Sequence, residues 1–170
     1  AVRPVLPELF TDDPEVIAGQ KRERSVIFTD EAGTVFAVRG SAYGDDLTLD
    51  QMLPHLVEAF QAAEDRRFYW HLGIDLIGLG RAIFVNLDEG RMVQGGSTIT
   101  QQLARILFLT NEKTLSRKVE EAFIAFWLEM NFSKDEILAL YLNRVYLGAG
   151  AYGVDAAARR YFGVSAKDVT

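Results

Sequence analysis

Segments with the apolar periodicity of α-helices alternate with short breaks from residue 47 onward, and this pattern constrains the fold more than any other. The segments begin near residues 54, 98, 114, 134 and 154. Pro54 suits the first turn of a helix, and Ser133 with Glu136 has the spacing of a capping box. The sequence therefore predicts a mainly α domain.

β structure is expected in one place, close to the N-terminus. The runs at 25–28 and 34–38 are short and β-prone, and the turn residues Asp30-Glu31-Ala32-Gly33 separate them. They predict a short N-terminal β-hairpin, which we expect to hold the only β structure. Residues 1–24 contain three of the chain's four prolines and little periodicity, so we expect an irregular lead-in.

Composition excludes several classes of protein. The 170 residues, 49% of them hydrophobic, suffice for one substantial core. A net charge of -6 argues against a nucleic-acid binder, so an anionic ligand needs a local cluster of cations. The absence of cysteine excludes disulfides and thiolate chemistry. No apolar run is long enough to span a bilayer and no signal peptide is evident, so we expect a soluble chain or a fragment cut from an anchor.

Glu64 is the first candidate for chemistry. A helix beginning at Pro54 places it on the same face as Leu56, Val57 and Phe60, within the apolar stripe. A partly desolvated carboxylate there suits a general acid or base. The alternative is a structural ion pair with Arg66, Arg67 or a distant cation, and the position of Glu64 taken alone favours this alternative.

Glu121 is the second candidate. The apolar stripe of its predicted helix consists of Leu115, Val119, Ala122, Phe123, Phe126 and Met130. Glu121 and Arg117 lie on the opposite, partly apolar face, which could form the wall of a cleft. The alternative is an ordinary surface pair between Arg117 and Glu121. Making or breaking a glycosidic bond requires at least two carboxylates that face one cleft.

The stretch from Gly95-Gly96-Ser97 to Gln102 predicts an anion site. A glycine turn with Ser97 as N-cap leaves backbone N–H groups free at a helix start. Thr98, Gln101, Gln102 and Arg105 are expected on the polar side of that helix, near the cations Lys113, Arg117 and Lys118. Such turns also occur for purely structural reasons. His71 and His55 show no metal-ligand spacing, and we expect His71 to pack or to form hydrogen bonds.

Five stretches of the chain, in order, resemble the five signatures of the peptidoglycan glycosyltransferases. This family comprises the transglycosylase domains of bifunctional class A penicillin-binding proteins and the monofunctional transglycosylases. The first three stretches are Glu64-Asp65-Arg66-Arg67-Phe68-Tyr69-Trp70-His71-Leu72-Gly73, Gly96-Ser97-Thr98-Ile99-Thr100-Gln101-Gln102 and Arg117-Lys118-Val119-Glu120-Glu121. The others lie at 134–143 and 150–163. The departures from the usual pattern are Trp70, Leu72, Ile106 and Val164.

The resemblance implies a fold and a place in the cell. We expect a lysozyme-like helical head lobe with a small apolar jaw lobe at 74–93 that faces the membrane. The glycosyltransferase domain would span 25–170 and continue past that point in the family. The resemblance places it at the periplasmic or outer face of the bacterial cytoplasmic membrane. It also leaves room for a transpeptidase domain in the parent protein.

The resemblance also implies a reaction. Glu64 would be the general base that activates the sugar 4-hydroxyl of lipid II. Lipid II would be polymerised into β-1,4-linked glycan strands with inversion and release of undecaprenyl pyrophosphate. Glu121 would assist the departure of undecaprenyl pyrophosphate, either directly or as the ligand of a divalent metal, Mg or Mn. The residues implied in substrate binding are Asp65, Phe68, Ser97, Thr98, Gln101, Gln102, Arg105, Lys113, Arg117, Lys118 and Asn143.

Other partners and two rival functions follow from the same signatures. The resemblance implies contact with the growing glycan chain and the membrane surface, and inhibition by moenomycin. One rival is a lysozyme-like hydrolase or lytic transglycosylase, which would need no pyrophosphate site. The other is a non-catalytic module that binds the lipid-linked precursor or a divisome partner.

Overall fold

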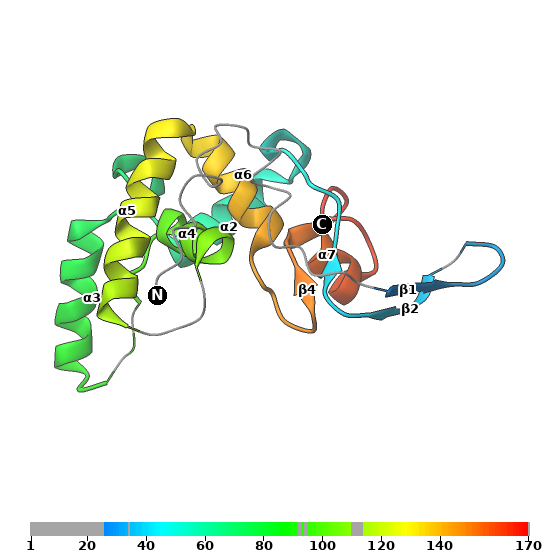
Figure 1. Ribbon diagram of the computed structural model, residues 1–170, viewed down its shortest axis with the longest axis horizontal. Helices are drawn as coiled ribbons and strands as arrows, with labels where there is room; N and C mark the ends of the chain where they lie inside the picture. Colours follow the sequence, from blue (N-terminus) through cyan, green and yellow to red (C-terminus); the bar gives the residue numbers. More distant parts are fainter. Residues whose placement is uncertain (1–25, 34, 92, 94, 110–113, 170) are drawn as a thin grey trace, which may run out of the picture. The chain divides into compact units, whose positions relative to one another are not determined.

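The computed structural model describes residues 26–33, 35–91, 93, 95–109 and 114–169. The chain divides into two compact units: a terminal unit of Ala1–Pro54 with Ala139–Thr170, and a central unit of His55–Leu138. The described part of the chain contains six α-helices, which confirms the prediction of a mainly helical fold (Figure 1). The lead-in predicted at 1–24 lies outside the described residues.

Five of the six helices begin close to the predicted positions, and α3 was not predicted. They are α2 (Pro54–Glu64), α3 (Leu76–Asp88), α4 (Ile99–Phe108), α5 (Leu115–Asn131), α6 (Lys134–Arg144) and α7 (Val154–Phe162). Two 3-10 turns, η1 (Leu49–Gln51) and η2 (Phe68–Trp70), precede and follow α2. The predicted capping box opens α6, because the Glu136 carboxylate accepts from Ser133 N at 2.7 Å and Ser133 Oγ accepts from Glu136 N at 3.3 Å.

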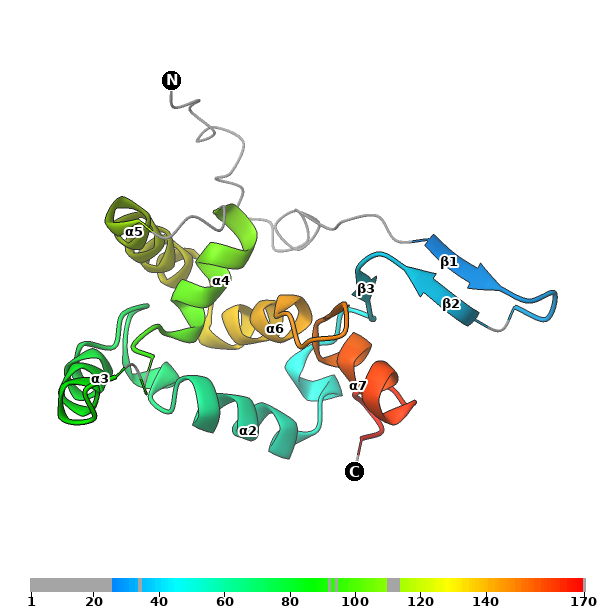
Figure 2. The ribbon, with the colours of Figure 1, turned by 90° about the horizontal axis from the view of Figure 1, so that it is seen from below.

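Helix α4 lies against α5 in the core of the central unit (Figures 1 and 2). The apolar face of α4 is largely buried, with Ile99, Leu103 and Leu107 inaccessible or nearly so and Ile106 partly buried. The predicted N-cap was wrong by one residue, since Thr98 rather than Ser97 caps the helix. Thr98 Oγ1 accepts from Gln101 N at 3.1 Å, and the Gln101 side chain accepts from Thr98 N at 3.2 Å.

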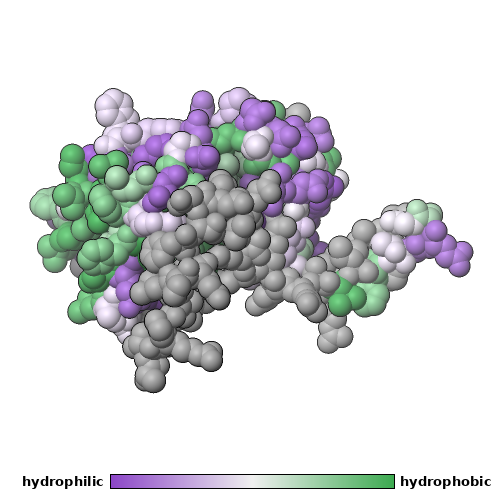
Figure 3. Space-filling model, turned by 45° about the horizontal axis from the view of Figure 1, so that its top comes forward, coloured by the Kyte–Doolittle hydropathy of each residue, from purple (hydrophilic) through white to green (hydrophobic). Residues whose placement is uncertain are grey.

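Helix α3 forms from a stretch in which two glycines disfavour a helix. Asp75 overcomes that weakness as N-cap, because its carboxylate accepts from Gly78 N at 2.9 Å. Ala82 is the one buried residue of α3. Most of the large apolar side chains of this helix are exposed, namely Leu76, Ile77, Leu79, Ile83, Phe84 and Leu87. They belong to the hydrophobic surface at the left of Figure 3.

The stronger apolar stripe of α5 is exposed, although such a stripe normally packs against the core. Leu115, Val119, Phe123, Phe126 and Met130 are all at least half exposed. The opposite face, with Arg117, Glu121, Ala125 and Leu128, is buried. The helix therefore buries its charged face in the central unit. Among the described residues, no helix is both long and apolar enough to cross a membrane.

The terminal unit contains the predicted hairpin and a second pair of strands. Strands β1 (Val26–Thr29) and β2 (Val35–Arg39) pair antiparallel. Strands β3 (Ala42–Tyr43) and β4 (Ala151–Tyr152) pair in parallel, so the expectation that the hairpin holds the only β structure was wrong. The sequence concealed this pair because each strand has two residues and the partners lie far apart along the chain.

Asp155, in the first turn of α7, connects several segments of the terminal unit by hydrogen bonds. Its buried carboxylate accepts from Asp45 N at 2.9 Å, Ser165 Oγ at 2.6 Å, Ala166 N at 2.9 Å and Arg159 Nε at 2.8 Å. Burial alone would raise the pKa of Asp155, but these donors outweigh it and lower the pKa to about 2.

Gly153, directly before α7, should not tolerate a side chain. Its φ of 84° is strained for other residues, and an added Cβ would lie 2.6 Å from the Asn143 carbonyl oxygen. We expect Gly153→Ala to lower the free energy of unfolding by about 3 kcal/mol, measured by urea denaturation. Gly163→Ala is the matched control, because Gly163 has a φ of 75° but nothing within 4 Å of the added Cβ. Its expected loss is about 1 kcal/mol, and equal losses would contradict the steric explanation.

Candidate active site

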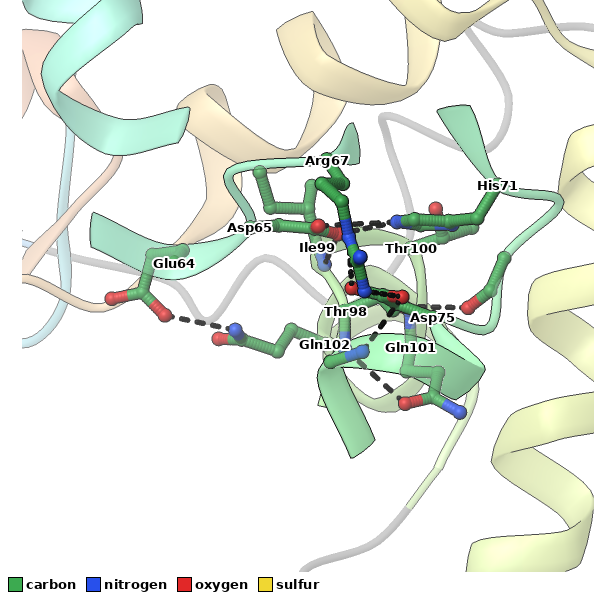
Figure 4. A network of polar contacts seen from close by, with 12 residues as sticks. Glu64, Asp65, Arg67, His71, Asp75, Thr98, Ile99, Thr100, Gln101 and Gln102 are labelled. Carbon is green, nitrogen blue, oxygen red and sulfur yellow. Dashed lines mark hydrogen bonds and ion pairs between the residues drawn. The ribbon is translucent and has the colours of Figure 1, made fainter. Parts of the chain in front are cut away.

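The candidate site is built around the start of α4, where Asp65 joins it to the end of α2 (Figure 4). Asp65 Oδ2 accepts from Ile99 N at 3.1 Å and lies 2.9 Å from His71 Nε2. Thr98 Oγ1 donates to the Gly73 carbonyl at 2.6 Å. The predicted hydrogen-bonding role of His71 is confirmed by its contact with Asp65.

These contacts differ from the anion site predicted at this helix start. Ile99 N donates to Asp65, Thr98 N to Gln101 and Gln101 N to Thr98, so these N–H groups are not free. Thr98 and Gln101 are also buried rather than on an exposed polar side. The capping box and Asp65 together occupy these three donors at the start of α4. These three N–H groups are therefore not available to an anion.

A second ion pair fixes the start of α3 to the turn after α2. Arg67 Nε donates to Asp75 Oδ2 at 3.1 Å. Burial raises the pKa of Asp75, but the Gly78 N–H and the Arg67 guanidinium outweigh it and hold the pKa below its usual value. Arg67 was considered as a partner for Glu64, and the structure pairs it with Asp75 instead. Sequence reasoning could not have found this pair, because Asp75 lies eight residues after Arg67 and the two do not have the spacing of neighbours on one helix.

Glu64 ends α2 with an exposed side chain, in contrast to the expected partial desolvation. Leu56, Val57 and Phe60 on the same helix are themselves only partly buried. Gln102 Nε2 donates to Glu64 Oε2 at 2.9 Å, which orients the carboxylate (Figure 4). A solvent-accessible carboxylate held by a neutral donor is free to accept a proton from a bound substrate.

Glu121 is 5% exposed, so its contact with Arg117 is not an ordinary surface pair. Glu121 Oε2 accepts from Lys118 Nζ at 2.9 Å, and Glu121 Oε1 lies 3.8 Å from Arg117 Nε. Lys118 Nζ also donates to Ser97 Oγ at 2.8 Å. Glu121 therefore holds a cation beside the turn that precedes α4.

A cavity of about 410 Å³ lies beside Glu64 in the central unit. Five of the predicted site residues line it: Glu64, Asp65, Ser97, Thr98 and Gln102. Its remaining lining residues are Ala62, Ala63, Arg66, Arg67, Asp75, Gly78, Arg81, Val93, Gly95 and Gly96. Glu121 does not line this cavity, but Lys118 links it to Ser97, which does. The two carboxylates are thus connected to one cavity, Glu64 directly and Glu121 through a lysine.

The remaining predicted residues have different surroundings. Phe68 is fully buried, with Lys134 Nζ 4.3 Å from its ring centre, and Arg105 is exposed on α4. Asn143 lies in the terminal unit, where it accepts from Leu47 N at 3.0 Å and donates to Leu47 O at 2.8 Å. Lys113 lies outside the described residues.

The side chains around Glu121 do not fit a resident divalent metal. Its carboxylate faces two cations, Lys118 and Arg117. The described residues also contain no group of three or more histidine or acidic side chains that could hold an ion. Because Mg²⁺ and Mn²⁺ need several oxygen ligands without competing ammonium groups, we assign no step to a metal.

This helical domain has an accessible carboxylate, Glu64, at a polar cavity, and a second, buried carboxylate, Glu121, linked to that cavity through Lys118 and Ser97. Two such carboxylates are features expected of an enzyme that makes or breaks glycosidic bonds. Comparison with known proteins agrees. The family model described as Transglycosylase matches residues 32–170, and the chain belongs to that family.

Curated relatives show the same similarity. The chain is 50% identical over 140 residues to penicillin-binding protein 1A of Aquifex aeolicus, covering 78% of this chain and 19% of that protein. It is 51% identical over 138 residues to penicillin-binding protein 1A of Escherichia coli, covering 81% and 16%. It is 47% identical over 126 residues to penicillin-binding protein 1F of Bacillus subtilis, covering 74% and 18%. The chain thus spans less than a fifth of each of these relatives, and the resemblance found in the sequence is confirmed.

Proposed function

We propose that this domain polymerises lipid II, a lipid-linked disaccharide, into β-1,4-linked peptidoglycan strands. The observation that supports this most directly is the Glu64 carboxylate, held by Gln102 at a polar cavity next to Ser97. Penicillin-binding proteins as relatives support the same substrate class.

In this reaction Glu64 accepts the proton of the 4-hydroxyl of the acceptor sugar. The hydroxyl oxygen forms a bond to the anomeric carbon of the donor chain, from the face opposite the diphosphate. The bond between that carbon and the diphosphate oxygen breaks, and the diphosphate leaves with the electron pair. An α-linked diphosphate is thereby replaced by a β-1,4 bond with inversion.

The leaving diphosphate is assigned to Lys118 and Ser97. Lys118 Nζ contacts both Ser97 Oγ and Glu121 Oε2, so the ammonium group is fixed in position before substrate arrives. A fixed cation stabilises the charge that develops on the departing oxygen at no cost in reorganisation. Glu121 then acts as a positioning residue for Lys118.

Glu121→Gln tests this positioning role. We expect the polymerisation kcat to fall by about 10²-fold, because the amide holds Lys118 less firmly than a carboxylate does. Lys118→Ala should cost a similar factor, and the double variant should be no worse than the stronger single variant. Glu120→Gln, an exposed neighbour on α5, is the control and should leave kcat unchanged. Additive losses in the double variant would contradict the shared role.

We place the membrane contact of this domain at 74–93, the proposed jaw. The exposed apolar side chains of α3, among them Ile77, Phe84 and Leu87, support this assignment. Such a surface suits an enzyme whose substrates are anchored by polyprenyl chains. The parent protein is proposed to work at the outer face of the cytoplasmic membrane, and the small share of each relative that the chain covers leaves room for a transpeptidase domain.

Polymerisation of purified lipid II tests the proposal. We expect glycan strands to form, and moenomycin to prevent their formation. Release of fragments from finished peptidoglycan without polymerisation would favour the hydrolase or lytic transglycosylase. Binding of lipid II without either reaction would favour the non-catalytic module.

A further inference from the structure

We propose that Thr100, in the first turn of α4, is a positioning residue that holds Gln102 within reach of Glu64. This inference rests on the proposed function, in which Glu64 accepts the proton of the acceptor sugar. Thr100 itself is fully buried and does not line the cavity, so it does not touch a substrate bound there. Its effect on the reaction must therefore pass through the helix that carries Gln102.

A buried carboxylate on α5 holds the Thr100 side chain. Thr100 Oγ1 donates to Glu129 Oε1 at 2.6 Å, and the Glu129 side chain is only 3% exposed. Lys134 Nζ donates to the same oxygen at 2.8 Å, so the charge of Glu129 is compensated within the protein. Because a hydrogen bond to a carboxylate is stronger than one between neutral groups, this contact fixes the first turn of α4 against α5.

The same network leads back to the end of α2. Lys134 Nζ also donates to the His71 carbonyl oxygen at 2.6 Å. The His71 side chain in turn contacts Asp65 at 2.9 Å, and Asp65 accepts from Ile99 N (Figure 4). Asp65 and Glu129 therefore hold neighbouring residues of α4 and belong to one connected network.

Thr100 and Gln102 face in nearly opposite directions from α4, because two residues along an α-helix correspond to a rotation of about 200°. Thr100 faces α5, where Glu129 lies, while Gln102 lines the cavity and donates to Glu64 Oε2 at 2.9 Å (Figure 4). Loss of the contact on one side lets the helix shift or rotate, which moves Gln102 on the other side. Misplacement by about 1 Å is enough to slow an enzymatic reaction by up to about 10²-fold.

Thr100→Val tests the inference, because valine has nearly the shape of threonine but no hydroxyl group. We expect the polymerisation kcat to fall by about tenfold, with the KM for lipid II unchanged, because Thr100 forms no part of the cavity wall. Thr100→Ser keeps the hydroxyl and should restore most of the rate. Ser165→Ala is the matched control, since Ser165 Oγ also donates to a buried carboxylate, that of Asp155, at 2.6 Å. It should lower stability and leave kcat unchanged.

A double-variant cycle separates positioning from a general loss of structure. If Thr100 acts through Gln102, Thr100→Val should have no further effect on kcat in a chain that already carries Gln102→Ala. A purely structural role would instead lower kcat by the same factor in both backgrounds. That result, a loss confined to KM, or an unchanged kcat in Thr100→Val would each overturn the inference.

The side-chain amide of Gln102 provides a measurement that does not depend on activity. Its NMR signals should move in Thr100→Val toward their positions in Glu64→Ala, where the acceptor of the hydrogen bond is absent, and should stay in place in Ser165→Ala. Signals that do not move in Thr100→Val would overturn the inference even if the domain polymerises lipid II. If they move but the unmodified domain makes no polymer, the proposed function fails and the positioning of Gln102 by Thr100 stands.

Discussion

Replacing Glu64 by glutamine is expected to lower the polymerisation kcat by about 10³-fold, within the range found for loss of a general base. Glutamine has nearly the same size and still contacts Gln102, but its amide oxygen is too weak a base to take the proton of a sugar hydroxyl. The measurement is the initial rate of glycan synthesis from lipid II at saturating substrate. Binding of lipid II should persist, because the variant removes the proton acceptor and leaves the cations in place.

The control for this prediction lies on the same helix. Glu58 is exposed on α2, and Glu58→Gln should leave the rate unchanged. Since Glu64 is itself exposed and ends the helix, Glu64→Gln should have a melting temperature within a few degrees of the unmodified domain. A rate within threefold of normal for Glu64→Gln would refute its role as the base.

Asp155→Ala is expected to have the largest effect on stability, lowering the free energy of unfolding by about 3 kcal/mol. The substitution leaves three donors without their shared acceptor, the N–H groups of Asp45 and Ala166 and the Ser165 hydroxyl, and it removes one of the two acids that pair with Arg159. Urea denaturation followed by circular dichroism measures the loss. Asp168→Ala, at an exposed acid in the same unit, is the control and should change stability by less than about 0.5 kcal/mol.

The same carboxylate predicts how stability depends on pH. Its pKa is about 2 in the folded chain and near 3.8 when unfolded, so the folded state binds the proton less tightly. The contribution, roughly 2 kcal/mol, is fully present above pH 3.8 and is lost as the pH falls toward 2. Asp155→Ala should therefore lose less stability than the unmodified domain between pH 4 and pH 2. Parallel acid-unfolding curves would contradict the assignment.

Sequence patterns located the helices because the signals that set them are local. The capping box of Ser133 and Glu136 and the start of α7 at Val154 are as predicted, since both depend on neighbouring residues. The burial of α5 was predicted less well. Its most apolar stripe is exposed while Glu121 is buried, because periodicity reveals that a helix has two faces but not which neighbour each face will meet.

The candidate site shows the same division between local and distant contacts. Glu64 and Glu121 were selected from their unusual positions on helical faces. The sequence did not indicate, however, that Asp65 and Gln101 would accept hydrogen bonds from the backbone at the start of α4. The pair of Arg67 with Asp75 was not foreseen, and neither was the place of Arg81 on the cavity wall.

The sequence by itself determined the family, the order of the helices and the two acidic residues proposed for chemistry, because each is recorded in short stretches of neighbouring residues. Tertiary structure alone decided which of the selected polar groups remain available to a ligand. A hydrogen-bond donor such as Ile99 N can be used once, and only the folded chain determines whether Asp65 or a substrate receives it.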